Sequence, residues 1–160
     1  MAKSTDFTHI DDHGQPHMVD VGDKKITQRV ATATSTVLLP DSVWSAIRGE
    51  ELMTKKGPVI QTAIIAAHMA VKKTAELIPL CHPLPLDGAK IWVELQAPEI
   101  KIYCRVKTTG KTGVEMEALH GATTAALTVY DMCKALSHEI IIKETKLIQK
   151  SGGKNDINLV

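Results

Sequence analysis

The chain has 160 residues, of which 44% are hydrophobic, 23% are charged and 3% are aromatic, and its formal net charge is +1. This length suits one domain with a proper core, which the scarcity of aromatics leaves to Ala, Val, Ile, Leu and Met. A net charge so close to zero excludes a general attraction to nucleic acid or to a membrane surface. The three cysteines, Cys81, Cys104 and Cys133, form no CxxC pair, which is typical of a reducing compartment.

The N-terminal residues do not show the pattern of a signal peptide. They lack the apolar core of a signal peptide, and no apolar run in the chain reaches the roughly 18 residues that a membrane span needs. We therefore expect a soluble, cytoplasmic protein. Residues 1–20 are polar and are interpreted as an arm that becomes ordered on assembly, whereas residues 21–160 are expected to form a single domain.

Hydrophobic periodicity predicts the main elements. Residues 25–39 are rich in β-branched side chains that roughly alternate, which indicates a strand, and a short helix with Val43, Trp44 and Ile47 on one side is expected next. Apolar residues at a 3.6-residue period predict a helix over 59–77. The remaining predicted elements are a proline-rich loop (78–86), a hairpin (88–96 with 99–108), a glycine-rich loop (108–113), a long helix (114–136), a strand (139–149) and a flexible tail (150–156).

This order of elements indicates a βαβ–βαβ pattern of the α+β class, in which two main helices cover one face of an antiparallel sheet. The other face would then be exposed, and the predicted strands carry many apolar residues. An exposed apolar face is a candidate subunit contact, so we expect an oligomer.

The long helix carries acidic groups at both ends. Glu115 and Glu117 lie near its start, and Asp131 and Lys134, three residues apart on one helix face, lie near its end. Glu117 and Asp131 are separated by 14 residues, which corresponds to roughly 21 Å along a helix. One small substrate cannot contact both on a single helix. Either one of them is structural, or two copies of the protein build the site together.

Two further features are candidates for chemistry. Cys81 and His82 lie in the proline-rich loop, where a rigid backbone would fix an imidazole for general acid–base work; zinc is the weaker interpretation, because no second ligand motif accompanies them. Lys56 and Arg29 could neutralise a polyphosphate if they converge, although each alone is an ordinary surface charge. A P-loop is excluded, because Arg105 stands where the first glycine of that motif is required.

Four stretches together resemble the MoaC family, the cyclic pyranopterin monophosphate synthases of molybdenum cofactor biosynthesis. They are HMVDV (17–21), LIPLCHPLPL (77–86), KTGVEMEALHGATTAALTVYDMCKAL (111–136) and KSGGK (150–154). The resemblance therefore covers residues 17–154. It implies a ferredoxin-like fold assembled as a homo-hexamer, a trimer of dimers, with active sites at the dimer interfaces.

The resemblance also implies a reaction. A lyase of this family would convert (8S)-3′,8-cyclo-7,8-dihydroguanosine 5′-triphosphate, made from GTP by a preceding radical enzyme, to cyclic pyranopterin monophosphate, with release of diphosphate. No cofactor and no metal site of the protein's own would be required, although a polyphosphate substrate leaves room for Mg²⁺.

Matching the family's motifs residue by residue assigns roles to this chain. The implied catalytic residues are Lys56, His82, Asp131 and Lys134. The implied substrate-binding residues are Leu80, Cys81, His82, Glu115, Met116, Glu117 and Arg29. We expect the four catalytic residues to serve one site, with Glu115, Met116 and Glu117 coming from the neighbouring subunit.

The alternative from another class is a non-catalytic oligomeric module that holds a nucleotide or pterin. Such a module would need the cations but not the pair Asp131 and Lys134. RNA binding on the sheet is disfavoured, because Trp92 and Tyr103 are the only aromatic residues in the predicted hairpin strands.

Overall fold

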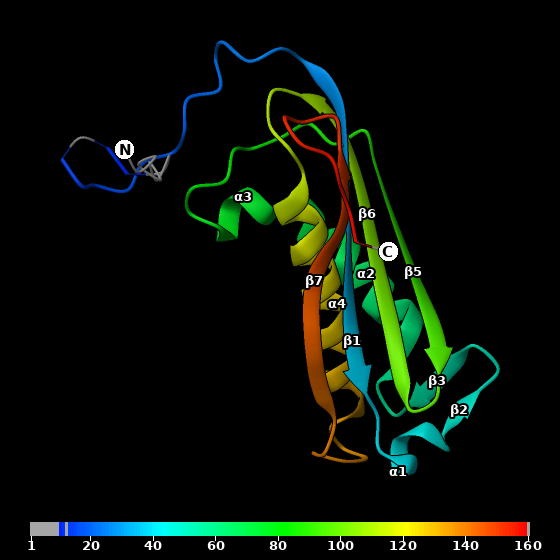
Figure 1. The fold of residues 1–160 in the computed structure, drawn as a ribbon. Helices are drawn as coiled ribbons and strands as arrows, with labels where there is room; N and C mark the ends of the chain where they lie inside the picture. The colour runs from blue at the N-terminus through cyan, green and yellow to red at the C-terminus, as the bar shows by residue number, and fades with distance from the viewer. Residues whose placement is uncertain (1–9, 12, 160) are drawn as a thin grey trace, which may run out of the picture.

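The computed structural model describes residues 10–11 and 13–159, which fold into two antiparallel sheets and four helices (Figure 1). The strands are β1 (Thr27–Leu38), β2 (Ile47–Arg48), β3 (Glu51–Thr54), β4 (Gly57–Pro58), β5 (Gly88–Gln96), β6 (Glu99–Gly110), β7 (Ile141–Ser151) and β8 (Ile157–Asn158). The helices are α1 (Asp41–Trp44), α2 (Val59–Lys72), α3 (Thr74–Leu77) and α4 (Glu115–Cys133). The predicted first strand, hairpin, long helix and last strand are confirmed, with ends that differ by a few residues.

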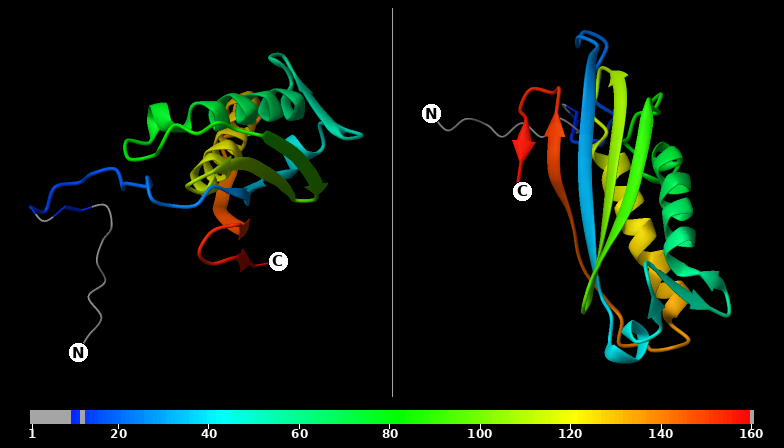
Figure 2. Two further views of the ribbon diagram at one scale, coloured as in Figure 1. Left: turned by 90° about the horizontal axis from the view of Figure 1, so that it is seen from above. Right: turned by 90° about the vertical axis from the view of Figure 1, so that its right-hand side faces the viewer.

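The larger sheet has the strand order β5-β6-β1-β7-β8, and every neighbouring pair is antiparallel. Helix α4 packs on β1, β6 and β7, and α2 packs beside it on α4 and β5. Both long helices lie on one face of the sheet, as the two views in Figure 2 show. An α+β architecture with helices covering one face was therefore predicted correctly.

The core lies between this sheet and the helices. On β1 the side chains of Ala31, Ala33 and Val37 are fully buried, and they alternate with threonines on the opposite face of the strand. The small residues of β1 let α4 approach closely, and Gly121 on α4 continues this contact: a β-carbon there would lie 2.6 Å from the sulfur of Cys104 on β6. The sheet and α4 are therefore in tight contact along their length.

The face of the sheet opposite the helices is polar, so the expectation of an exposed apolar face is wrong. In the strand register Thr32 lies opposite Arg105 on β6, and Thr36 lies opposite Lys101. The β-branched threonines of β1 raise its strand propensity without making its outer face apolar. Oligomerisation stays a prediction, and this face gives no apolar argument for it.

The helix predicted over 59–77 is interrupted. Lys73 leaves the helical region (φ −111°, ψ 11°), so that α2 ends at Lys72 and α3 begins at Thr74. The buried Thr74 hydroxyl lies 3.2 Å from Nδ1 of His120 on α4. The helix is thus interrupted where it contacts α4, and the spacing of apolar residues in the sequence does not reveal such an interruption.

The segment between β1 and α2 differs most from the prediction. The short helix α1 is a single turn, and Ile47 lies in β2 rather than on that helix. A small sheet, β2-β3-β4, follows; its strands of two to four residues are too short for periodicity to reveal. The Glu51 carboxylate accepts hydrogen bonds from the backbone N–H groups of Ile60 (2.8 Å) and Gln61 (3.2 Å), which ties β3 to the start of α2.

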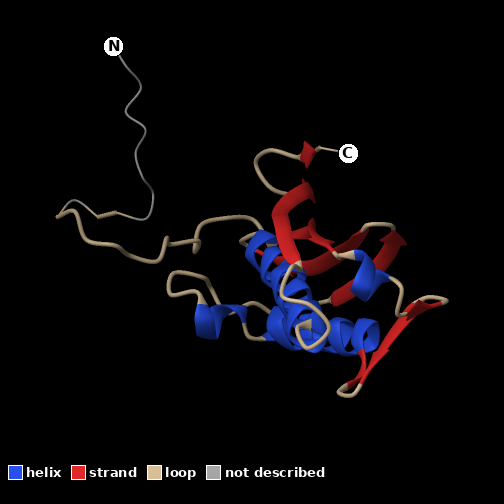
Figure 3. Ribbon diagram, turned by 90° about the horizontal axis from the view of Figure 1, so that it is seen from below, coloured by secondary structure: helices blue, strands red, loops and turns tan. Residues whose placement is uncertain are grey.

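The loop before α4 and the C-terminal tail also required correction. Strand β6 continues to Gly110, so it includes the first part of the predicted loop 108–113, and the predicted flexible tail leads into β8, which pairs with Gln149 and Lys150. Of the predicted arm, residues 1–9 and 12 lie outside the described part. The described remainder is mostly exposed and extends away from the sheet (Figure 3). Within the residues described, no helix is long and apolar enough to cross a membrane.

Candidate functional site

Helix α4 places two groups of candidate residues at its opposite ends. Its first turn carries Glu115, Met116 and Glu117, and Asp131 lies in its last turn, with Lys134 just beyond. The helix is continuous over 19 residues, so the predicted separation of roughly 21 Å between Glu117 and Asp131 follows directly from its rise.

The group at the end of α4 is a lysine–aspartate cluster, formed by Lys56, Asp131 and Lys134. The Asp131 carboxylate accepts one hydrogen bond from each lysine, with N–O distances of 2.7 Å, and Lys56 also donates to the Asp131 backbone carbonyl at 2.9 Å. Lys56 reaches α4 from the tight turn between β3 and β4, where Gly57 has a φ of +110° that other residues rarely adopt. The small sheet is thus the element that positions Lys56.

The charges of this cluster are mutually stabilised. Hydrogen bonds from Lys134 and Lys56 lower the pKa of Asp131 to about 2, and the Asp131 carboxylate in turn raises the pKa of Lys134. All three side chains are about half exposed, and a ligand can therefore reach them. At neutral pH the cluster presents ammonium groups held on a carboxylate, an arrangement suited to binding phosphate.

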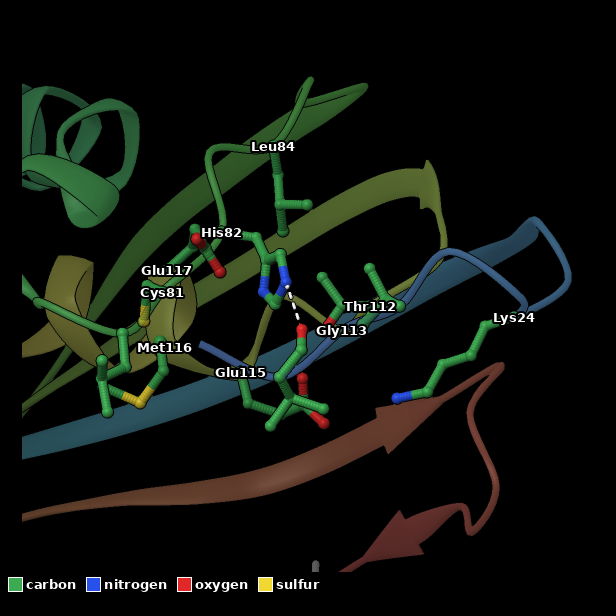
Figure 4. A pocket seen from close by; sticks show the side chains of 12 residues that line it. Lys24, Cys81, His82, Leu84, Thr112, Gly113, Glu115, Met116 and Glu117 are labelled. Atoms are coloured by element: carbon green, nitrogen blue, oxygen red, sulfur yellow. Dashed lines mark hydrogen bonds between the residues drawn. The ribbon is translucent and has the colours of Figure 1, made fainter. Parts of the chain in front are cut away.

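The group at the start of α4 lines a pocket of about 340 Å³, here called the His82 pocket (Figure 4). The proline-rich loop supplies one wall and the first turn of α4 supplies another. The predicted residues that line it are Leu80, Cys81, His82, Glu115, Met116 and Glu117. Gly113 lies at its rim, where a β-carbon would lie 1.9 Å from a carboxylate oxygen of Glu115 and would displace that side chain.

The imidazole of His82 is fixed by the N-terminal segment. Its Nε2 lies 2.8 Å from the Val19 carbonyl oxygen, which can only accept, so Nε2 carries a proton (Figure 4). Nδ1 is the ring nitrogen left to face a substrate. Val19, Val21 and Lys24 also line the pocket, so the segment before β1 forms part of the site.

The two glutamates of the pocket differ in environment. Glu115 is paired with Lys150 on β7, with an N–O distance of 3.1 Å. Glu117 is only 5% exposed, and this burial, together with the nearby charge of Glu115, raises its pKa. Burial and the charge of Glu117 likewise raise the pKa of the Cys81 thiol. Glu117 is therefore the carboxyl group best placed to hold a proton and donate it.

The raised pKa of Glu117 predicts a pH dependence of stability. A carboxyl group whose pKa is higher in the folded state binds more protons there, so stability falls as the pH rises from the unfolded-state pKa through the folded-state pKa. Glu117→Gln removes the ionisable group and therefore this loss of stability at higher pH. We expect its free energy of unfolding, relative to wild type, to increase as the pH is raised from about 4.5 towards 7.5.

Urea denaturation at a fixed protein concentration and several pH values measures this difference. Glu139→Gln, a change at an exposed glutamate outside the pocket, is the matched control, and the Glu117→Gln difference should rise with pH relative to it. A Glu117→Gln difference that stays constant across this range would contradict the assignment.

Arg29 lies in a third place, an arginine pocket of about 260 Å³. Its Nε donates to the Gly110 carbonyl at 3.2 Å, and Gly152 and Gly153 of the C-terminal segment also line the pocket. The cations that line this pocket are Lys24, Lys25, Arg29 and Lys154. Lys24 lines both this pocket and the His82 pocket, so the two adjoin.

One predicted grouping is wrong. In each site, one subunit was expected to supply His82 together with the lysine–aspartate cluster. The neighbouring subunit was expected to supply Glu115, Met116 and Glu117. Instead His82 lines one pocket with Glu115, Met116 and Glu117 of the same chain. The reason is that the proline-rich loop folds back onto the start of α4, which a linear sequence does not reveal.

Sequence reasoning missed Lys24 as a site residue. It belongs to a polar run, DKK at 23–25, that looks like an ordinary polar segment before a strand. Its role is seen only in the structure, where it lines both pockets. Glu51, which ties β3 to α2 and so supports the turn bearing Lys56, was also missed. Among the described residues, no group of three or more His, Cys, Asp or Glu side chains is arranged to hold a metal ion.

Comparison with known proteins identifies the family. The chain is 54% identical over 159 residues to a cyclic pyranopterin monophosphate synthase of Xanthomonas campestris pv. campestris (strain 8004), covering 98% of this chain and 96% of that protein. It is 47% identical to a protein of the same name from Helicobacter pylori (strain HPAG1), covering 93% and 94% respectively. It is also 54% identical to the molybdenum cofactor biosynthesis bifunctional protein of Synechocystis sp. The matched region there covers 95% of this chain but only 45% of that longer protein. The MoaC family pattern matches residues 18–153, and the chain belongs to the MoaC family.

Proposed function

We propose that the chain is a cyclic pyranopterin monophosphate synthase, a lyase that converts (8S)-3′,8-cyclo-7,8-dihydroguanosine 5′-triphosphate to cyclic pyranopterin monophosphate and diphosphate. The relatives at 47–54% identity carry this name over almost their whole length. The observation that carries the proposal is the distribution of charges along α4: the lysine–aspartate cluster at one end, and a pocket with His82, Glu115 and Glu117 at the other.

The reaction requires two kinds of group. Rearrangement of the purine-derived ring needs proton donors and acceptors, roles that suit Glu117, His82 and the ammonium group of Lys134. A cyclic phosphate forms when a sugar hydroxyl attacks the α-phosphorus and diphosphate leaves, and the charge that develops on the phosphate oxygens needs cations. The four cations of the arginine pocket, beside the His82 pocket, are suited to the triphosphate. Mg²⁺, where present, would arrive with the phosphates, and no cofactor is required by this scheme.

We further propose that two chains complete each site. Within one chain the cluster and the His82 pocket lie about four helical turns apart, too far for one substrate. The outer sides of the two long helices carry exposed apolar residues: Ile65 (60%), Met69 (51%) and Leu127 (58%). If α4 of a second copy crosses α4 antiparallel near Thr124, the partner's Glu117 approaches Asp131, because both lie seven residues from that point.

The homo-hexamer, a trimer of dimers, is proposed on the family's pattern. The strand order β5-β6-β1-β7, with one long helix after β1 and another after β6, supports a ferredoxin-like assignment of the fold. The three free cysteines support a location in the reducing cytoplasm.

A turnover assay tests the proposed reaction against the rival interpretation, a non-catalytic binding module. Purified protein would receive the cyclic dihydroguanosine triphosphate while pterin product and diphosphate are measured. The proposal expects product from wild type, none from Lys56→Ala, and full turnover from Lys143→Ala, which removes a lysine with a similarly exposed side chain. Substrate binding without product in wild type would favour the module.

A further inference from the structure

The segment that carries Lys56 has little support from the core. Residues 53–58, here called the Lys56 hairpin, are each exposed or half-buried. The nearest fully buried side chains are Leu52 before the hairpin and Val59 after it. Strand β4 ends in Pro58, which has no N–H group to donate to a strand ladder. Apolar packing and strand pairing therefore leave the position of this hairpin weakly fixed.

Helix α2, which follows the hairpin directly, begins without a cap of its own. The residue before it is Pro58, no side-chain capping bond forms there, and the first turn contains no acidic residue. The first N–H groups of an α-helix have no acceptor within the helix. The start of α2 therefore needs an acceptor from another element.

Glu51 of β3 supplies this acceptor. Its Oε1 accepts hydrogen bonds from the backbone N–H groups of Ile60 and Leu52, each at 2.8 Å, and its Oε2 accepts one from Gln61 at 3.2 Å. A carboxylate is favoured at this place by the positive end of the helix dipole, and hydrogen bonds to an ionised acceptor are stronger than those to a neutral one. Glu51 therefore joins the strand that enters the Lys56 hairpin to the helix that leaves it.

The hairpin itself is held in shape by Thr54. The Thr54 hydroxyl accepts a hydrogen bond from the backbone N–H of Lys56 at 3.2 Å and donates one to the Gly57 carbonyl at 3.3 Å. These bonds lie within the turn and do not connect it to the rest of the protein. Thr54 therefore sets the shape of the hairpin, and Glu51 sets where its base lies.

The two lysines of the lysine–aspartate cluster depend on this hairpin to different degrees. The small sheet lies beside the end of α4 (Figure 2), where Lys56 donates to the carboxylate and the carbonyl of Asp131. Lys134 follows Asp131 by three residues in the same segment, so its placement does not involve the hairpin. Among the described residues, no hydrogen bond joins Glu51 to the cluster. A displaced hairpin would therefore separate Lys56 from Asp131 and leave Lys134 in place.

We propose that Glu51 is a positioning residue for the lysine–aspartate cluster: its bonds to the start of α2 hold the hairpin where Lys56 meets Asp131. Glu51 acts through Lys56 and is not itself a catalytic residue. Its effect on turnover rests on the proposed function. The placement of Lys56 does not, because it is measured on the protein alone.

A zero-length cross-link tests this placement. A carbodiimide joins a lysine amine to a carboxylate only where the two groups are in contact, and mass spectrometry after proteolysis identifies the linked residues. Wild type should give a Lys56–Asp131 link and a Lys134–Asp131 link, because both N–O distances are 2.7 Å. Glu51→Ala removes every side-chain bond to α2, so it should lose the Lys56–Asp131 link and retain the Lys134–Asp131 link.

Two further variants accompany this measurement. Glu51→Gln is milder, because its amide oxygen can still accept from the two N–H groups that Oε1 serves while Gln61 loses its acceptor. It should give a yield of the Lys56–Asp131 link between those of wild type and Glu51→Ala. The matched control is Glu50→Ala, which removes the neighbouring exposed glutamate and should give wild-type yields of both links. Circular dichroism establishes that each variant is folded.

Turnover provides the second measurement. Glu51→Ala should lower it by about tenfold to a hundredfold, the order of loss that follows when a reacting group is misplaced by about 1 Å, whereas Glu50→Ala should retain wild-type turnover. A wild type that forms no product would contradict the proposed function, and the cross-links would still decide the placement of Lys56. A Lys56–Asp131 link of wild-type yield in Glu51→Ala would overturn the proposal. So would an equal fall in both links, because a displaced hairpin separates only one lysine from Asp131.

Discussion

Asp131→Asn is expected to lower turnover by about 10²–10⁴-fold, the range by which positioned acid–base groups accelerate reactions. The asparagine keeps the size of the side chain but removes the charge that holds Lys56 and Lys134, each at 2.7 Å. The pKa of Lys134 then loses the influence that raises it, and both ammonium groups lose their shared anchor. The fold should remain, because this cluster is half exposed.

The control for this prediction is Glu99→Gln. It removes a comparable ion pair, Glu99 with Lys143 at 2.9 Å, in which neither residue belongs to the cluster, and it should retain wild-type turnover. Initial rates of pterin formation give the comparison. An Asp131→Asn variant with more than about a tenth of wild-type turnover would show that the carboxylate is not part of the acid–base machinery.

Leu127→Arg is expected to abolish turnover without altering any proposed catalytic residue. Leu127 is 58% exposed and lies one turn before Asp131 on α4. An arginine there introduces a charge into the proposed helix contact, and its burial without a partner costs several kcal/mol. The chain should fold normally, while the two parts of each site no longer meet.

The comparison for this variant is Leu159→Arg, which changes another exposed leucine (70%) near the C-terminus and should leave assembly and turnover unchanged. Sedimentation velocity and the turnover assay are measured on the same preparation. If Leu127→Arg remains fully assembled and active, the outer side of α4 is not the contact that completes the site.

Long and regular segments of this fold could be predicted from sequence. Strand β1, the β5–β6 hairpin and helix α4 each repeat one period over 9 to 19 residues, which gives a clear signal. The small sheet could not be predicted, because its strands are two to four residues long. The interruption at Lys73 coincides with the contact between Thr74 and His120, which depends on the tertiary arrangement.

The candidate site was predictable as a set of residues but not as an arrangement. The pair Asp131 and Lys134 followed from helical spacing, and the proline-rich loop indicated a fixed His82. The association of His82 with Glu115 and Glu117, and the role of Lys24 between two pockets, arise from chain folding over long sequence separations. The 14-residue spacing on α4 was nevertheless enough to raise the hypothesis of a site shared between two copies.

Complementation between two inactive variants tests that hypothesis most directly. Asp131→Asn removes the cluster and His82→Ala alters the pocket, so a mixed dimer has one site with both defects and one site with neither. Co-expression in equal amounts should restore about a quarter of wild-type turnover, because random pairing makes half of the dimers mixed. Asp131→Asn mixed with Lys56→Ala, two changes in the same cluster, should restore nothing. No recovery in the first mixture, with mixed dimers present, would contradict a site built from two chains.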